Sequence, residues 1–98
     1  MSARHTHRKD TNHDEIDKAL RAVGAGVTSL VSLGGGVSDL LVSFRMRWHV
    51  LEVKSPGGKV RDSQWKWIGE QKAEVHVVDS VEAALEAIGA VTLTRGGA

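Results

Sequence analysis

Two strand-like segments separated by only two residues constrain this chain more than any other feature. Residues 37–44 (VSDLLVSF) and 47–54 (RWHVLEVK) are rich in β-branched and apolar side chains, a composition that favours strands. Arg45 and Met46 between them leave room only for a tight turn. We therefore expect an antiparallel hairpin, in which each residue of the first segment faces a defined residue of the second.

Two acidic side chains fall opposite each other in this hairpin. A turn centred between Arg45 and Met46 pairs Asp39 with Glu52, and the Cβ atoms of such facing residues lie about 4.5–5.5 Å apart. Two carboxylates at this separation repel each other unless a cation lies between them. A divalent metal is such a cation. With the Val53 carbonyl as a third oxygen ligand, the site suits Mg²⁺ or Mn²⁺ better than Zn²⁺ or copper.

Lys54 lies on the same face of the second segment as Glu52, because side chains alternate along a strand. Its ammonium group can orient or help to deprotonate a water molecule there and can offset the charge of a phosphate. Phosphodiester hydrolysis requires both, because its transition state accumulates negative charge and the attacking water must be activated. The same residues have a simpler interpretation, in which Asp39, Glu52 and Lys54 form an ordinary ion cluster near a strand end.

The remaining segments surround the hairpin with further strands and helices. Asn12 followed by Glu15 has the pattern of a capping box, so we expect the first helix to begin there. The elements expected outside the hairpin lie at residues 13–24, 27–33, 62–72, 75–78 and 80–88. With the two hairpin strands included, the order is helix, three strands, helix, strand and helix. This order predicts an α/β protein with a mixed four-stranded sheet flanked by helices.

Domain organisation follows from the same pattern. Residues 1–11 lack apolar periodicity and are expected to form a disordered basic arm. Residues 12–90 then form a single domain, followed by a flexible tail at 91–98. No apolar run approaches the ~20 residues that span a bilayer, and the first residues are polar. The expectation is therefore an intracellular protein without a membrane partner.

Charge and cysteine content narrow the possible chemistry. The formal net charge is only +1, but residues 45–72 hold more basic than acidic side chains, which suits a polyanionic partner on one face. The chain has no cysteine. Disulfides, thiolate metal sites and cysteine nucleophiles are therefore excluded, and any bound metal must be held by oxygen or imidazole nitrogen.

These motifs together resemble the PD-(D/E)xK nuclease superfamily, and within it the small stand-alone VRR-Nuc (virus-type replication-repair nuclease) domains. The resemblance covers residues 13–88. It rests on a first helix with Glu15 and on three short motifs, residues 36–40 (GVSDL), 51–54 (LEVK) and 63–68 (SQWKWI). Ser38 stands where the superfamily's name has proline, which is not a ligand. The resemblance implies a restriction-endonuclease-like core.

The resemblance also implies a role for each residue of the hairpin site. Asp39 and Glu52 would bind Mg²⁺, with Mn²⁺ as a substitute, and the Val53 carbonyl would complete the metal site. Lys54 would serve the attacking water. The implied activity is that of a Mg²⁺-dependent endodeoxyribonuclease.

Two residues outside the hairpin gain a catalytic role from the resemblance. Glu15 would touch a second metal or hold Lys54, although Glu in the first turn of a helix is also a common capping residue. Gln64 would reach back towards the metal or the scissile phosphate, unless it is an ordinary exposed helix residue. Three basic side chains beside the site could hold DNA phosphates without reading bases, namely Lys59, Arg61 and Lys66.

The predicted function is a metal-dependent endonuclease that cleaves structured DNA, such as four-way junctions, with little base-sequence specificity. The resemblance further suggests a cytoplasmic protein encoded by a phage in a bacterial host. The alternative function is a non-catalytic nucleic-acid-binding or assembly domain of the same fold. Because two sites are needed to cut two strands, we expect a symmetric homodimer, with a contact patch formed by Val27, Leu30, Val31, Leu33 and Trp67.

Overall fold

Residues 3–90 fold as a four-stranded mixed sheet with three α-helices. A computed structural model describes the backbone of residues 3–90 and the side chains of residues 12–90. The elements in chain order are α1 (Ala3–Ala22), β1 (Gly26–Ser29), a short 3₁₀ helix η1 (Val31–Leu33), β2 (Leu40–Phe44), β3 (Arg47–Val53), α2 (Asp62–Glu70), β4 (Val75–Val78) and α3 (Val81–Ala87). This confirms the predicted α/β class and the predicted order of helices and strands.

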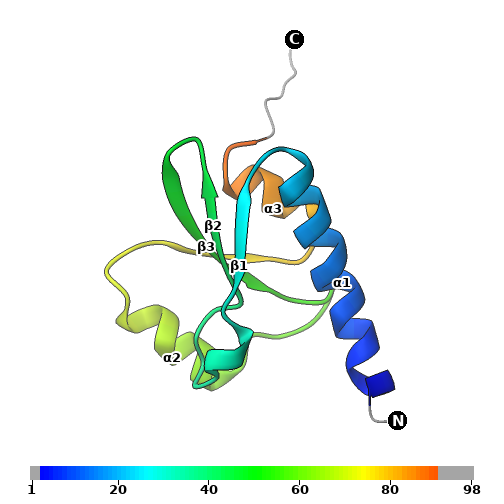
Figure 1. The fold of residues 1–98 in the computed structure, drawn as a ribbon. Coiled ribbons are helices and arrows are strands. Elements are labelled where there is room, and N and C mark those ends of the chain that lie inside the picture. Colours follow the sequence, from blue (N-terminus) through cyan, green and yellow to red (C-terminus); the bar gives the residue numbers. More distant parts are fainter. Residues whose placement is uncertain (1–2, 91–98) are drawn as a thin grey trace.

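The sheet has the strand order β1-β2-β3-β4. The first three strands are antiparallel, whereas β4 runs parallel to β3. Because parallel neighbours cannot be joined by a tight turn, the chain crosses over through α2 between them. The crossover begins with the loop after β3, which leads into α2 (Figure 1).

The predicted hairpin register is confirmed within the strands. Phe44 pairs with Arg47 and Leu40 with Leu51, and the tight turn places Arg45 and Met46 at positive φ, as a two-residue hairpin turn requires. Asp39, however, lies one residue before β2 begins, and its N–H donates to the Leu51 carbonyl at 3.1 Å. The ladder pairing expected between Asp39 and the facing acid is therefore not formed.

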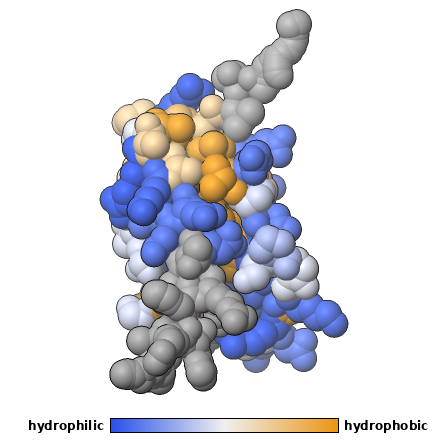
Figure 2. All heavy atoms as spheres, turned by 90° about the vertical axis from the view of Figure 1, so that its right-hand side faces the viewer, coloured by the Kyte–Doolittle hydropathy of each residue, from blue (hydrophilic) through white to orange (hydrophobic). Residues whose placement is uncertain are grey.

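One face of the sheet carries the hydrophobic core. Figure 1 shows α1 and α3 together on this side, with α2 away from them. The buried apolar side chains are Ile16, Leu20, Ala25, Leu40, Val42, Leu51, Val53, Val78, Ala84 and Ile88. Figure 2 shows the side of the molecule that lies on the right in Figure 1. This side is mostly hydrophilic, with apolar residues gathered in its upper half. Because side chains alternate along β3, Glu52, which lies between Leu51 and Val53, points to the opposite face.

The N-terminal expectation is wrong in two respects. Residues 3–11 belong to α1 rather than to a disordered arm, and Asn12 lies inside the helix rather than at its cap. No glycine or proline interrupts the chain between Ala3 and Ala22, so the helix can begin before its apolar stripe. The predicted arm residues 1–2 and the predicted tail at 91–98 lie outside the described residues.

The first strand is shorter than the predicted 27–33. It ends at Ser29, whose Oγ accepts a hydrogen bond from the Val31 N–H at 3.3 Å and so favours a turn into η1. The glycine run that follows η1 packs closely against the start of α2. Gly36 has φ +85°, and a Cβ added to it would overlap the Ser63 carbonyl. Only glycine permits this approach, which brings the segment before Asp39 against the start of α2.

Across the part of the chain that the structure describes, no helix has the length and apolar character needed to cross a membrane.

Candidate active site

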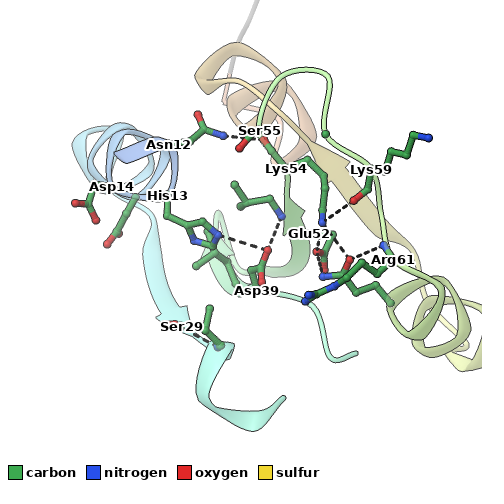
Figure 3. A pocket seen from close by; sticks show the side chains of 16 residues that line it. Asn12, His13, Asp14, Ser29, Asp39, Glu52, Lys54, Ser55, Lys59 and Arg61 are labelled. Carbon is green, nitrogen blue, oxygen red and sulfur yellow. Dashed lines mark hydrogen bonds and ion pairs between the residues drawn. The ribbon is translucent and has the colours of Figure 1, made fainter. Parts of the chain in front are cut away.

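A pocket of about 720 Å³ lies where the end of β3 meets α1 and the segment that leads into α2 (Figure 3). It is lined by residues of α1, β1, η1, β2, β3 and α2 and by the segments before β2 and after β3. Most of the residues predicted for a site line this pocket, namely Asp39, Glu52, Val53, Lys54, Lys59, Arg61 and Gln64. Lys66 is exposed on α2 and does not line it.

Glu52 is fully buried on the sheet face opposite the hydrophobic core. Its Oε2 accepts a hydrogen bond from Gln64 Nε2 at 2.6 Å and lies 3.6 Å from Lys54 Nζ. Its Oε1 has no hydrogen-bond partner among the described residues. A buried carboxylate oxygen without a donor costs free energy, so Glu52 has one coordination position left for a ligand.

Burial raises the pKa of Glu52 to about 7, and the negative charge of Asp39 adds to this rise. Lys54 opposes the rise through its positive charge, and the nearby Ser38 hydroxyl lowers the pKa as well. Ser38 Oγ nevertheless has no hydrogen-bond partner of normal geometry. The charge repulsion expected between the two acids is therefore present, although they are not a ladder pair.

Asp39 is held by the end of β3. Its Oδ2 accepts a hydrogen bond from the Val53 N–H at 2.8 Å, and its side chain is 15% exposed. The N–H and the carbonyl of one strand residue point to the same edge. The Val53 carbonyl therefore points to the side on which Asp39 lies, as its predicted role as an oxygen ligand requires.

Gln64 is a buried link between the catalytic candidates and α2, and the interpretation as an exposed helix residue is wrong. Its Oε1 accepts hydrogen bonds from Lys54 Nζ at 3.0 Å and from the Arg61 N–H at 2.8 Å. The second bond satisfies a backbone donor at the helix N-terminus. Together with the bond to Glu52, these contacts make Gln64 a positioning residue in this structure.

Lys54 is held on several sides. Besides its contacts with Glu52 and Gln64, its Nζ donates to the Lys59 carbonyl at 3.0 Å, and its backbone carbonyl accepts from Asn12 Nδ2 at 2.7 Å. This last bond joins α1 directly to the end of β3. The lysine is consequently fixed beside the buried carboxylate.

Glu15 does not share this pocket. It is exposed on α1, and because the helix begins at Ala3 it is not a capping residue either. The helix instead presents His13 and Asp17, which are four residues apart and therefore on one face. Sequence reasoning missed His13; the signal was its position next to the apolar stripe of α1.

His13 contacts the site from the α1 side. Its Nε2 lies 3.6 Å from Asp39 Oδ2, and its side chain is 28% exposed. Figure 3 shows the imidazole directed towards the carboxylate, with Glu52 and Lys54 on the other side of Asp39. The pocket therefore has an imidazole on one flank and a lysine on the other.

The residues fit a divalent cation. Two carboxylates lie close enough for the charge of Asp39 to raise the pKa of Glu52, and Glu52 Oε1 is buried without a donor. Within residues 12–90, no three His, Asp or Glu side chains already stand together in ligating geometry. Binding would therefore require side-chain adjustments around Asp39 and Glu52.

A scan against protein-family models finds none that matches this chain, and comparisons with curated proteins and with solved structures give no match either. The resemblance to PD-(D/E)xK nucleases therefore remains a prediction from the sequence motifs. What the structure establishes is a mixed four-stranded α/β fold with a pocket between α1 and α2 that is lined by both acidic and basic side chains.

Proposed function

We propose that this protein is a Mg²⁺-dependent endonuclease that hydrolyses phosphodiester bonds in structured DNA. The observation that carries the proposal is the buried Glu52 with one unpaired oxygen, beside a second carboxylate and a fixed lysine in one pocket. A structural ion pair requires only one acid, and a second acid that raises the pKa of the first would weaken it. A cation-binding site uses two acids, because the metal offsets their repulsion.

These contacts assign a role to each residue of the site. Asp39, Glu52 and the Val53 carbonyl would hold Mg²⁺, which when bound supplies a Lewis acid that stabilises negative charge on the phosphate and acidifies water. Lys54 orients the attacking water and stabilises developing charge on the phosphate. Gln64 keeps Glu52 and Lys54 in place.

Binding of DNA is assigned to the basic residues beside the pocket. Lys59 and Arg61 are exposed and line it, and Lys66 extends the basic surface along α2. Contacts from such side chains to phosphates position DNA without reading its bases. This favours recognition of DNA shape, such as a four-way junction, over recognition of sequence.

A homodimer completes the proposal, because cutting two strands requires two sites. The predicted contact patch needs one correction: Val27 packs against the core and is not available. Val31 and Leu33 are exposed, and Leu30 and Trp67 are partly exposed. These four residues remain the proposed patch.

The alternative is a non-catalytic nucleic-acid-binding domain, and one observation favours it. The Lys54 ammonium group already contacts Glu52, Gln64 and the Lys59 carbonyl, which is the arrangement expected of a structural ion cluster. In that case Asp39 and Glu52 would be needed for stability and not for cleavage.

Cleavage assays distinguish the two functions. The full chain is incubated with duplexes, flaps and four-way junctions, each with Mg²⁺ or EDTA. We expect cleavage only with Mg²⁺, and its loss in Asp39→Asn and Glu52→Gln. Glu70→Gln, which changes an exposed acid at the end of α2, is the matched control and should retain activity. DNA binding without cleavage of any substrate would support the alternative.

A further inference from the structure

His13 is placed beside the proposed metal site by the packing of α1. The buried side chains Ile16 and Leu20 fix the helix against the core, and the Asn12 bond to the Lys54 carbonyl fixes the turn that carries His13. The imidazole is thus presented to Asp39 by a rigid element rather than by a loop. Rigid elements hold ligands more accurately than loops do.

The distance between His13 and Asp39 suits two ligands of one ion. Neighbouring ligand atoms in an octahedral site with bonds of about 2.1 Å lie about 3 Å apart. His13 Nε2 and Asp39 Oδ2 are 3.6 Å apart, and the partly exposed imidazole has room to close the difference. The two groups do not make a hydrogen bond at this distance.

A second observation favours a ligand in this pocket. Glu52 is fully buried and lines the pocket, and its Oε1 has no donor. Within residues 12–90, no three His, Asp or Glu side chains already stand in ligating geometry, so a cation held by Asp39 would satisfy this oxygen only after the side chains of Asp39 and Glu52 move together. The ligand set would then contain two carboxylates and one imidazole.

We propose that His13 is a direct ligand of the divalent cation held by Asp39, and that its nitrogen makes the site select Mn²⁺ over Mg²⁺. This inference rests on the proposed function only in assuming that the pocket binds a metal. Imidazole suits transition metals, whereas Mg²⁺ favours a set of oxygen ligands. A site with His13 should therefore bind Mn²⁺ more tightly than the predicted set of oxygen ligands would.

The experiment measures metal binding on the full chain without DNA. Mn²⁺ binding is followed by the loss of the free-ion electron paramagnetic resonance signal, and Mg²⁺ binding by competition. Pulsed measurements on the bound Mn²⁺ then detect coupling to a directly bonded ¹⁴N nucleus. The variants are His13→Gln and, as a matched control, His76→Gln, since the two histidine side chains are 28% and 26% exposed.

The expected result is a ¹⁴N coupling in the wild type and in His76→Gln, and its absence in His13→Gln. Loss of His13 should weaken Mn²⁺ binding at least about tenfold, as for other groups that support a metal site, and should weaken Mg²⁺ binding much less. Circular dichroism confirms that each variant is folded.

Two outcomes overturn different claims. Mn²⁺ that binds the wild type without a ¹⁴N coupling, and is lost in Asp39→Asn, would refute the role of His13 and leave the proposed metal site intact. An unchanged Mn²⁺ affinity in His13→Gln would likewise refute the role of His13 and leave the proposed metal site intact. If the wild type binds neither cation, both the inference and the proposed function fail.

Discussion

Glu52 should make the metal-free protein less stable as the pH rises. The pKa of this buried carboxyl is raised from 4.5 to about 7. Between these values the folded state binds a proton that the unfolded state has released. The free energy of unfolding therefore falls by about 1.4 kcal/mol per pH unit in this window. Over the whole window the loss is about 3 kcal/mol, which is a large share of the stability of a small domain.

The substitution Glu52→Gln isolates this effect. A neutral amide keeps the size of the side chain and can still accept the hydrogen bond from Gln64, but it does not titrate. Other groups that titrate in the same range, including the histidines, are common to both proteins and cancel in the comparison. The variant should be more stable than the wild type at pH 8, by up to about 3 kcal/mol, and not at pH 4.5.

Urea unfolding in EDTA, followed by tryptophan fluorescence, provides the measurement. Wild type, Glu52→Gln and the control Glu70→Gln are compared at pH 4.5 and at pH 8. Saturating Mn²⁺ should remove most of the pH dependence of the wild type, because a cation favours the charged form of Glu52. If the difference in unfolding free energy between wild type and Glu52→Gln is the same at both pH values, the carboxyl is not perturbed and the reasoning fails.

Three further predictions concern DNA binding, the close approach of Gly36 to α2 and the oligomeric state. Replacing Lys59 or Arg61 by alanine should weaken DNA binding about equally for unrelated sequences and flatten the salt dependence of log K by about one unit per contact; a loss confined to one sequence would show base readout instead. Gly36→Ala should destabilise the fold by about 2–4 kcal/mol, because the new methyl group meets the backbone of α2 at positive φ. Gly35→Ala, at a similar φ but in open space, should cost only about 1 kcal/mol. Equal losses of unfolding free energy in urea would exclude the steric explanation. Light scattering at micromolar concentration should report twice the chain mass of 10.5 kDa, and Leu33→Glu should return it to a single chain; a wild-type monomer would contradict the dimer.

The sequence alone was sufficient for the hairpin, although not for the pairing of Asp39 with Glu52. The register from Leu40 to Phe44 was predictable because a two-residue turn leaves few ways to pair the strands. The β4 boundaries were also predictable, as was a helix over 80–88; in the structure Ser80 caps it, since its Oγ accepts from the Ala83 N–H at 3.0 Å. Both depend on residues near each other in the chain, where periodicity and capping patterns are informative.

Only the tertiary structure decided which side chains complete the pocket. Asn12 reads as a helix cap in the sequence, yet it donates to the carbonyl of Lys54, 42 residues away. Gln64 was expected either to reach back towards the site or to be an ordinary exposed residue, and it is buried because the start of α2 packs over Glu52. His13, rather than Glu15, faces Asp39 because the packing of Ile16 and Leu20 sets the rotation of α1 about its axis. Local propensity contains no information about that rotation, because it is fixed by burial of apolar surface contributed by distant segments.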